Sequence, residues 1–185
     1  MRSPQIYWIS SNDPPESFPD IRRAFDVPDG LLAAGGDLSE ERLIYAYSHG
    51  IFPWYNEGQP ILWWSPNPRC VIYPDRLHVS RRLNRSLKRS NLYVTFNTAF
   101  EAVIDYCAKD RPGQDGTWIT PELTRGFKEL FSIGRAHSVE VWRGDALVGG
   151  LYLLVRRHRR AAGWSRRCRL PQRPDIWAPA CSLPG

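Results

Sequence analysis

Aromatic side chains are the first feature of this 185-residue sequence that points to chemistry. Six of them fall in three short stretches, namely Phe52, Trp54, Tyr55, Trp63, Trp64 and Trp118. Trp54 follows a proline and Trp118 follows Gly-Thr, which are positions where side chains often line clefts. Flat rings stack on nucleobases with about 1–3 kcal/mol per base. The set indicates a nucleotide site, with ordinary core packing as the alternative.

A cationic stretch is the second candidate. Residues 80–89 carry five cations and no anion, at Arg81, Arg82, Arg85, Lys88 and Arg89. At helical spacing these side chains repel one another unless an anion lies close. The stretch predicts either a phosphate-binding face or a solvated helix face.

Residues 31–37 form a small-residue segment that leads into a helix, where backbone N–H groups can meet an anion. The segment lacks the glycine pattern and the lysine of a P-loop, so we expect a packed turn. Classical catalytic patterns such as G-x-S-x-G and H-E-x-x-H are missing from the sequence. His49, His78 and His137 are isolated, and we expect structural roles for them.

The four cysteines lie far apart and without histidines at metal-ligand spacing. We therefore expect reduced thiols and no zinc. Cys70 and Cys107 sit in apolar stretches, which predicts two small buried residues.

Spacing and capping signals predict the elements that must position these residues. Helices are expected at 39–49, with Asp37 and Glu40 as a capping box, at 80–89, from Thr98, and from Pro121, with Thr120 as its cap and Gly134 as its end. Strands are expected at 61–64, 69–73, 92–96, 137–142 and 147–152, the last two as a hairpin. Residues 14–36 favour irregular backbone. Helices and strands without regular βαβ alternation predict an α+β fold.

The positive charge is concentrated at one end of the chain. The net charge is +6, and residues 156–185 hold eight arginines against one aspartate, so residues 1–155 carry 6 − 7 = −1. No stretch approaches the roughly 18 apolar residues of a membrane span, and the N-terminus lacks the apolar part of a signal peptide. The sequence therefore predicts a cytoplasmic protein without membrane contact.

Six stretches, in order along the chain, carry a resemblance to a known family. They are GLLAAGGDLS at 30–39, AYSHGIFPWY at 46–55, PILWWSPNPR at 60–69, GTWIT at 116–120, AHSVEVW at 136–142 and LVGGLY at 147–152. On these motifs, residues 20–152 resemble the leucyl/phenylalanyl-tRNA–protein transferases.

The resemblance implies a bacterial enzyme of the N-end rule degradation pathway. Such an enzyme moves Leu or Phe from aminoacyl-tRNA to the N-terminal amine of proteins that begin with Lys or Arg, as a monomer and without a metal or other cofactor. The implied organisation is a small N-terminal domain at 1–75 and the first part of an acetyltransferase-like (GNAT-like) domain at 76–152.

The resemblance also implies roles for particular residues. Trp54 and Trp118 match tryptophans that hold the terminal adenosine of the tRNA, and Tyr47 matches a position beside that pocket. Leu151 matches a position that lines the apolar pocket for the Leu or Phe side chain. The cationic residues of 80–89 become candidate contacts to the acceptor-stem phosphates.

The family's catalytic carboxylate, in a Gly-Glu-Ser-Met-Phe segment, and its Asp-x-Gln segment have no counterpart in this sequence, so no catalytic residue is nominated. Residues 153–185 are rich in Arg and Pro and show no helical or strand period. They are either the product of a frameshift or a genuine basic tail that binds RNA. If the tail is genuine, we expect a chain without transfer activity, which leaves a non-catalytic tRNA-binding remnant as the alternative function.

Overall fold

The computed structural model describes residues 5–109, 117–155, 176–177 and 180–181. The chain divides into two compact units. The first comprises Met1–Arg69 and Ala108–Leu130, and the second comprises Cys70–Cys107 and Phe131–Gly185. The domain limits that the sequence suggested, at residues 75 and 152, stay predictions.

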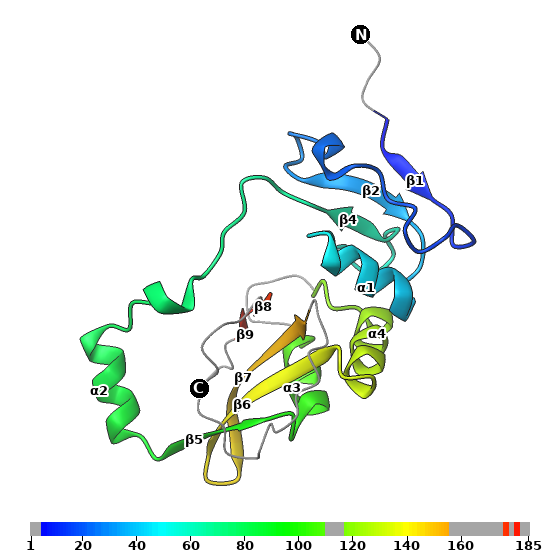
Figure 1. Ribbon diagram of the computed structural model, residues 1–185. Helices are drawn as coiled ribbons and strands as arrows, with labels where there is room; N and C mark the ends of the chain where they lie inside the picture. The colour runs from blue at the N-terminus through cyan, green and yellow to red at the C-terminus, as the bar shows by residue number, and fades with distance from the viewer. Residues whose placement is uncertain (1–4, 110–116, 156–175, 178–179, 182–185) are drawn as a thin grey trace. The chain divides into compact units, whose positions relative to one another are not determined.

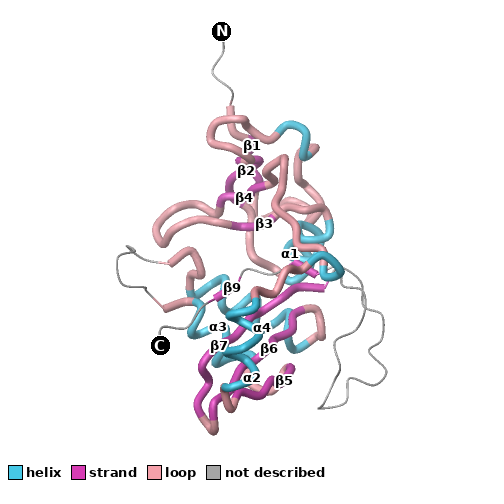
Figure 2. Tube along the Cα trace, turned by 90° about the vertical axis from the view of Figure 1, so that its left-hand side faces the viewer, coloured by secondary structure: helices cyan, strands magenta, loops and turns pink. Residues whose placement is uncertain are grey.

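A four-stranded sheet forms the centre of the first unit, in the order β1 (Tyr7–Ile9), β2 (Leu31–Gly35), β4 (Leu62–Trp64) and β3 (Phe52–Pro53) (Figure 2). β1 and β2 are parallel, and the other pairs are antiparallel. Leu32, Ala33 and Ala34 are buried in β2. The expectation of a packed turn at 31–37 and of irregular backbone at 14–36 is wrong for β2, because β1 and β4 pair with its two edges and outweigh the low strand propensity of its Ala and Gly residues.

Two helices of the first unit carry apolar faces, α1 (Glu40–Ser48) and α4 (Pro121–Ser132), the latter in this unit as far as Leu130. A Cβ on Gly126 would lie 2.9 Å from Leu43 Cδ1, so the glycine permits the close approach of α4 to α1. Both predicted helices are confirmed, as is the Thr120 cap, whose hydroxyl accepts from the N–H of Leu123 at 3.3 Å.

The second unit contains an antiparallel sheet in the order β5 (Leu92–Phe96), β6 (Ala136–Arg143) and β7 (Ala146–Val155), with α3 (Phe100–Cys107) packed against it (Figure 1). A Cβ on Gly150 of β7 would lie 2.9 Å from a methyl of Val103, which explains a glycine beneath the helix. The helix predicted at 80–89 is present as α2 (Arg81–Arg89), and the predicted hairpin is confirmed as β6–β7. Two short 3-10 helices lie at Ile21–Arg23 and Pro74–Arg76.

Three further predictions from the sequence are wrong. Residues 69–73 form no strand, and Cys70 among them is exposed, although Cys107 is buried as predicted. The predicted capping box does not form, because the helix α1 begins after Ser39 and Asp37 instead pairs with Arg42.

The expectation of no regular structure from residue 153 onward is also wrong in part. Residues 153–155 continue β7, and β8 (Ile176–Trp177) and β9 (Ala180–Cys181) pair with it in antiparallel register. The rest of the basic tail lies outside the described residues. Helices and sheets together confirm the α+β class. Within the described part of the chain, no helix has the length and apolarity needed to cross a membrane.

Candidate functional site

Trp54 follows β3 and is fixed through both of its backbone polar groups. Its N–H donates to the carbonyl of Leu62 at 2.9 Å, and its carbonyl accepts from the indole N–H of Trp64 at 2.7 Å. The two indole rings are 5.6 Å apart at an angle of 53°. The side chain of Trp54 nevertheless remains 51% exposed, so core packing does not account for it. A solvent-facing indole on a fixed backbone can stack on a base.

Trp63 and Tyr55 are core residues, in contrast to Trp54. Trp63 is fully buried, and its indole N–H donates to the carbonyl of Gly35 at 2.9 Å. Tyr55 is buried, and its hydroxyl lies 2.9 Å from that of Thr120. For these two residues the packing alternative is correct.

The bond between Tyr55 and Thr120 joins the two segments that carry the candidate tryptophans. Trp54 immediately precedes Tyr55, and Trp118 lies two residues before Thr120, where the chain enters α4. Trp118 is half-buried, and the turn that carries it is closed by the N–H of Ile119 donating to the Thr117 hydroxyl at 3.2 Å. The structure thus places Trp54 and Trp118 on two directly bonded segments of the same unit.

Tyr47 lies in the last turn of α1, half-buried, with its ring 6.4 Å from that of Phe127. Burial raises the pKa of the Tyr47 hydroxyl far above its usual value, and the nearby Arg69 guanidinium only partly opposes this. The hydroxyl is therefore neutral at physiological pH and can serve as a hydrogen-bond donor.

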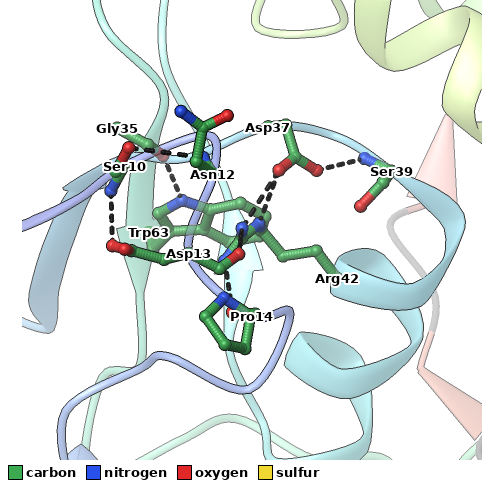
Figure 3. A network of polar contacts seen from close by, with 9 residues as sticks. All are labelled: Ser10, Asn12, Asp13, Pro14, Gly35, Asp37, Ser39, Arg42 and Trp63. Carbon is green, nitrogen blue, oxygen red and sulfur yellow. Dashed lines mark hydrogen bonds and ion pairs between the residues drawn. The ribbon is translucent and has the colours of Figure 1, made fainter.

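Arg42 ties α1 to the chain that leads from β1, and the sequence did not reveal it (Figure 3). The guanidinium is buried and donates to the Asp37 carboxylate through Nε at 3.1 Å and Nη2 at 3.0 Å. It also donates to the carbonyls of Asp13 at 2.8 Å and Pro14 at 3.3 Å. Burial would raise the pKa of Asp37, but hydrogen bonds from Ser39 and Arg42 outweigh it and lower that pKa. This clamp holds the start of the helix that bears Tyr47.

The remaining predicted site residues lie in the second unit. Leu151 is half-buried on β7, opposite Val139 of β6. Arg81, Arg82 and Arg85 of α2 are exposed, as either reading of the cationic stretch requires. Lys88 and Arg89 belong to the same helix, but their side chains lie outside the described part of the structure.

Glu140 of β6 is a second polar residue that the sequence did not reveal. Its side chain is fully buried, yet its carboxylate accepts hydrogen bonds from the hydroxyls of Thr95 at 2.5 Å, Thr98 at 3.0 Å and Ser138 at 2.5 Å. It also accepts from the N–H of Ala99 at 3.4 Å, immediately before α3. The carboxylate therefore joins β5, β6 and the N-terminal end of α3.

The described residues also form a cavity apart from the predicted site residues. A cavity of about 240 Å³ in the first unit is lined by other side chains, namely Phe18, Pro19, Asp20, Ile21, Tyr45, His49 and Ile51. Within residues 5–109, 117–155, 176–177 and 180–181, no three or more His, Cys, Asp or Glu side chains form a group that could hold a metal ion.

Comparison with known proteins agrees with the motifs that surround these residues. The family model described as leucyl/phenylalanyl-tRNA protein transferase matches residues 71–162, and the model of the N-terminal domain of that family matches residues 36–67. The chain belongs to the leucyl/phenylalanyl-tRNA–protein transferase family. The match runs past Tyr152, where the motif resemblance ended.

Curated members of this transferase family are close in sequence. The transferase of Azotobacter vinelandii is 59% identical over 139 residues, which cover 75% of this chain and 62% of the relative. That of Pseudomonas aeruginosa strain LESB58 is 55% identical over 150 residues, covering 81% and 66%. That of Pectobacterium carotovorum is 54% identical over 148 residues, covering 80% and 62%. The chain thus spans slightly less than two thirds of the length of these transferases.

Proposed function

We propose that the protein transfers Leu or Phe from aminoacyl-tRNA to the N-terminal amine of proteins that begin with Lys or Arg, as a cytoplasmic step of the bacterial N-end rule pathway. Membership of the leucyl/phenylalanyl-tRNA–protein transferase family carries this proposal. Names of relatives more than 50% identical to the chain support aminoacyl transfer.

The proposed reaction exchanges an ester for an amide. The neutral α-amine attacks the carbonyl carbon of the aminoacyl ester, the new C–N bond forms, and the C–O bond to the ribose of the tRNA breaks. The ribose oxygen leaves and takes up a proton as the amine loses one. Such a step depends on holding the amine and the ester together and on stabilising the developing oxyanion.

The first unit would hold the aminoacyl-adenosine end of the tRNA. Trp54 is anchored by its backbone and exposed on its ring, which suits stacking on the terminal adenine. Trp118 would supply the second aromatic contact, and the neutral Tyr47 hydroxyl would donate a hydrogen bond. These roles rest on the family resemblance together with the exposure and anchoring described above.

The second unit would contribute specificity and electrostatic attraction. Leu151 would line the apolar pocket for the Leu or Phe side chain. A pocket of that kind discriminates by only about 1–3 kcal/mol per methylene, so it can admit both residues. The exposed Arg81, Arg82 and Arg85, together with Lys88 and Arg89 of the same helix, would contact acceptor-stem phosphates.

A transfer assay tests the proposal. The purified 185-residue chain is incubated with Leu-tRNA labelled in the amino acid and with a peptide that begins with Lys, next to the same peptide beginning with Ala. Label on the Lys peptide alone confirms the proposed reaction, and the Azotobacter relative serves as the positive control. Salt-dependent tRNA binding without transfer would instead support the non-catalytic alternative, which the comparisons do not favour. Absence of both binding and transfer would refute the proposal.

A further inference from the structure

Arg69 has a geometry that the proposed roles do not use. It closes the 60–69 motif and lies half-buried in the first unit. Its Nη1 donates to the carbonyl of Gly50 at 3.1 Å, and its guanidinium carbon lies 4.5 Å from the centroid of the Phe52 ring. One side chain therefore contacts Gly50, in the short link between α1 and β3, and Phe52, the first residue of β3.

That link lies between Tyr47 and Trp54, which are on one continuous stretch of chain and are both proposed to contact the aminoacyl-adenosine. Tyr47 lies in the last turn of α1, the chain then turns through Gly50 with φ +76°, and Trp54 follows directly after β3. The turn is held from the helix side by the N–H of Ile51, which donates to the carbonyl of Ala46 at 2.9 Å. From the other side it is held by the guanidinium of Arg69.

The chemistry of these contacts favours arginine over lysine. A planar guanidinium can stack on a ring and donate in its own plane at the same time, whereas an ammonium group has no such plane. Burial lowers the pKa of Arg69 to about 10, with the neighbouring Tyr47 acting in the opposite direction. The group thus remains a cation at neutral pH, so both contacts are charge-assisted.

We propose that Arg69 is the positioning residue of the aminoacyl-adenosine site: by bonding to Gly50 and stacking on Phe52, it fixes Trp54 relative to Tyr47. The inference deepens the proposed function and rests on it. Arg69 itself makes no contact with the ligand in this account. The rival explanation is that Arg69 contacts a tRNA phosphate directly. A ligand without phosphate distinguishes the two, because only the positioning role predicts weaker binding of such a ligand when Arg69 is replaced.

The experiment uses the full chain and the phosphate-free analogue 3′-(phenylalanylamino)-3′-deoxyadenosine. The variants are Arg69→Lys, the control Arg22→Lys, whose side chain is exposed and bonded to Asp20, and Trp54→Phe. We expect Arg69→Lys to weaken binding about tenfold, because the loss of one charge-assisted contact within the protein makes the binding-competent arrangement about tenfold less populated, and we expect Arg22→Lys to leave binding unchanged. Unchanged affinity of Arg69→Lys, or equal losses in Arg69→Lys and Arg22→Lys, would overturn the inference.

A second readout separates positioning from general loss of structure. The chain is labelled with 5-fluorotryptophan, and the 19F resonance of Trp54 is assigned by its loss in Trp54→Phe. We expect Arg69→Lys to shift the Trp54 resonance and to leave that of Trp142, in the second unit, in place. An unmoved Trp54 resonance would refute positioning even if binding falls. If the unaltered chain does not bind the analogue, the proposed function fails, whereas the resonance still decides the role of Arg69.

Discussion

Replacing Arg42 by Met is expected to destabilise the first unit by about 3 kcal/mol. The guanidinium is 1% exposed and makes four hydrogen bonds, two to Asp37 and one each to the carbonyls of Asp13 and Pro14 (Figure 3). Methionine fills a similar volume and satisfies none of these acceptors. Removal of one partner from a buried pair costs about 3–5 kcal/mol, and the lower end applies because the Asp37 side chain is 32% exposed.

Urea unfolding with hydrogen exchange by mass spectrometry measures this loss. Exchange should accelerate most in peptides that cover residues 31–48, because the clamp joins the end of β2 to α1. Arg22→Met is the matched control, since that arginine also pairs with an aspartate, Asp20, but both side chains are exposed. We expect no measurable change in the control. Equal destabilisation by both substitutions would show that the buried position of Arg42 is not what makes its contacts strong.

Three further predictions concern single groups of the fold. The lowered pKa of Asp37 means that its carboxylate contributes stability above the ordinary carboxyl pKa of 3.8 and that this contribution is lost as the pH falls below that value. Urea midpoints between pH 3 and 6 should therefore vary less in Asp37→Asn than in the unaltered chain. An equally steep pH profile in the variant would contradict this. Glu140→Gln should lower the free energy of unfolding by about 2 kcal/mol, measured in urea, and should speed hydrogen exchange in α3. Unchanged protection of α3 would refute the anchoring role. Gly126→Val should cost about 1–3 kcal/mol because its side chain would press on Leu43, and an unchanged midpoint would disprove close packing there.

Elements with local signals could be predicted from the sequence. The helix after Thr120 has a cap, a proline at its first position and apolar residues at helical spacing, and all of these depend on neighbours within a few residues. The β6–β7 hairpin is likewise encoded by alternation around the short turn at Gly144 and Asp145. Local geometry suffices in both cases because the partners of each residue are close in sequence.

Elements whose partners are distant could not be predicted in the same way. β2 ends in Ala33, Ala34 and Gly35, which have low strand propensity, and it is a strand because β1 and β4 pair with its two edges. Arg42 bonds to carbonyls 28 and 29 residues away, and Glu140 to side chains 42 and 45 residues away. Asp37, taken as a helix cap, has its carboxylate engaged by one of these buried groups. No local pattern distinguishes such residues from surface charges.

Exposure likewise divides the aromatic residues that composition alone grouped together. Trp63 lies in β4, opposite Pro53 of β3, and Trp54 follows β3 with its N–H bonded to the carbonyl of Leu62, yet Trp63 is fully buried and Trp54 is 51% exposed. Alternation along β4 places Trp63 toward the core, while Trp54 follows the end of β3, where the ladder stops. The buried ring stabilises the strand pair, which in turn fixes the backbone of the exposed ring. A substitution at Trp63 would therefore impair ligand binding through loss of structure, whereas one at Trp54 would remove a contact from an intact fold, so only the Trp54 variant can test the proposed stacking.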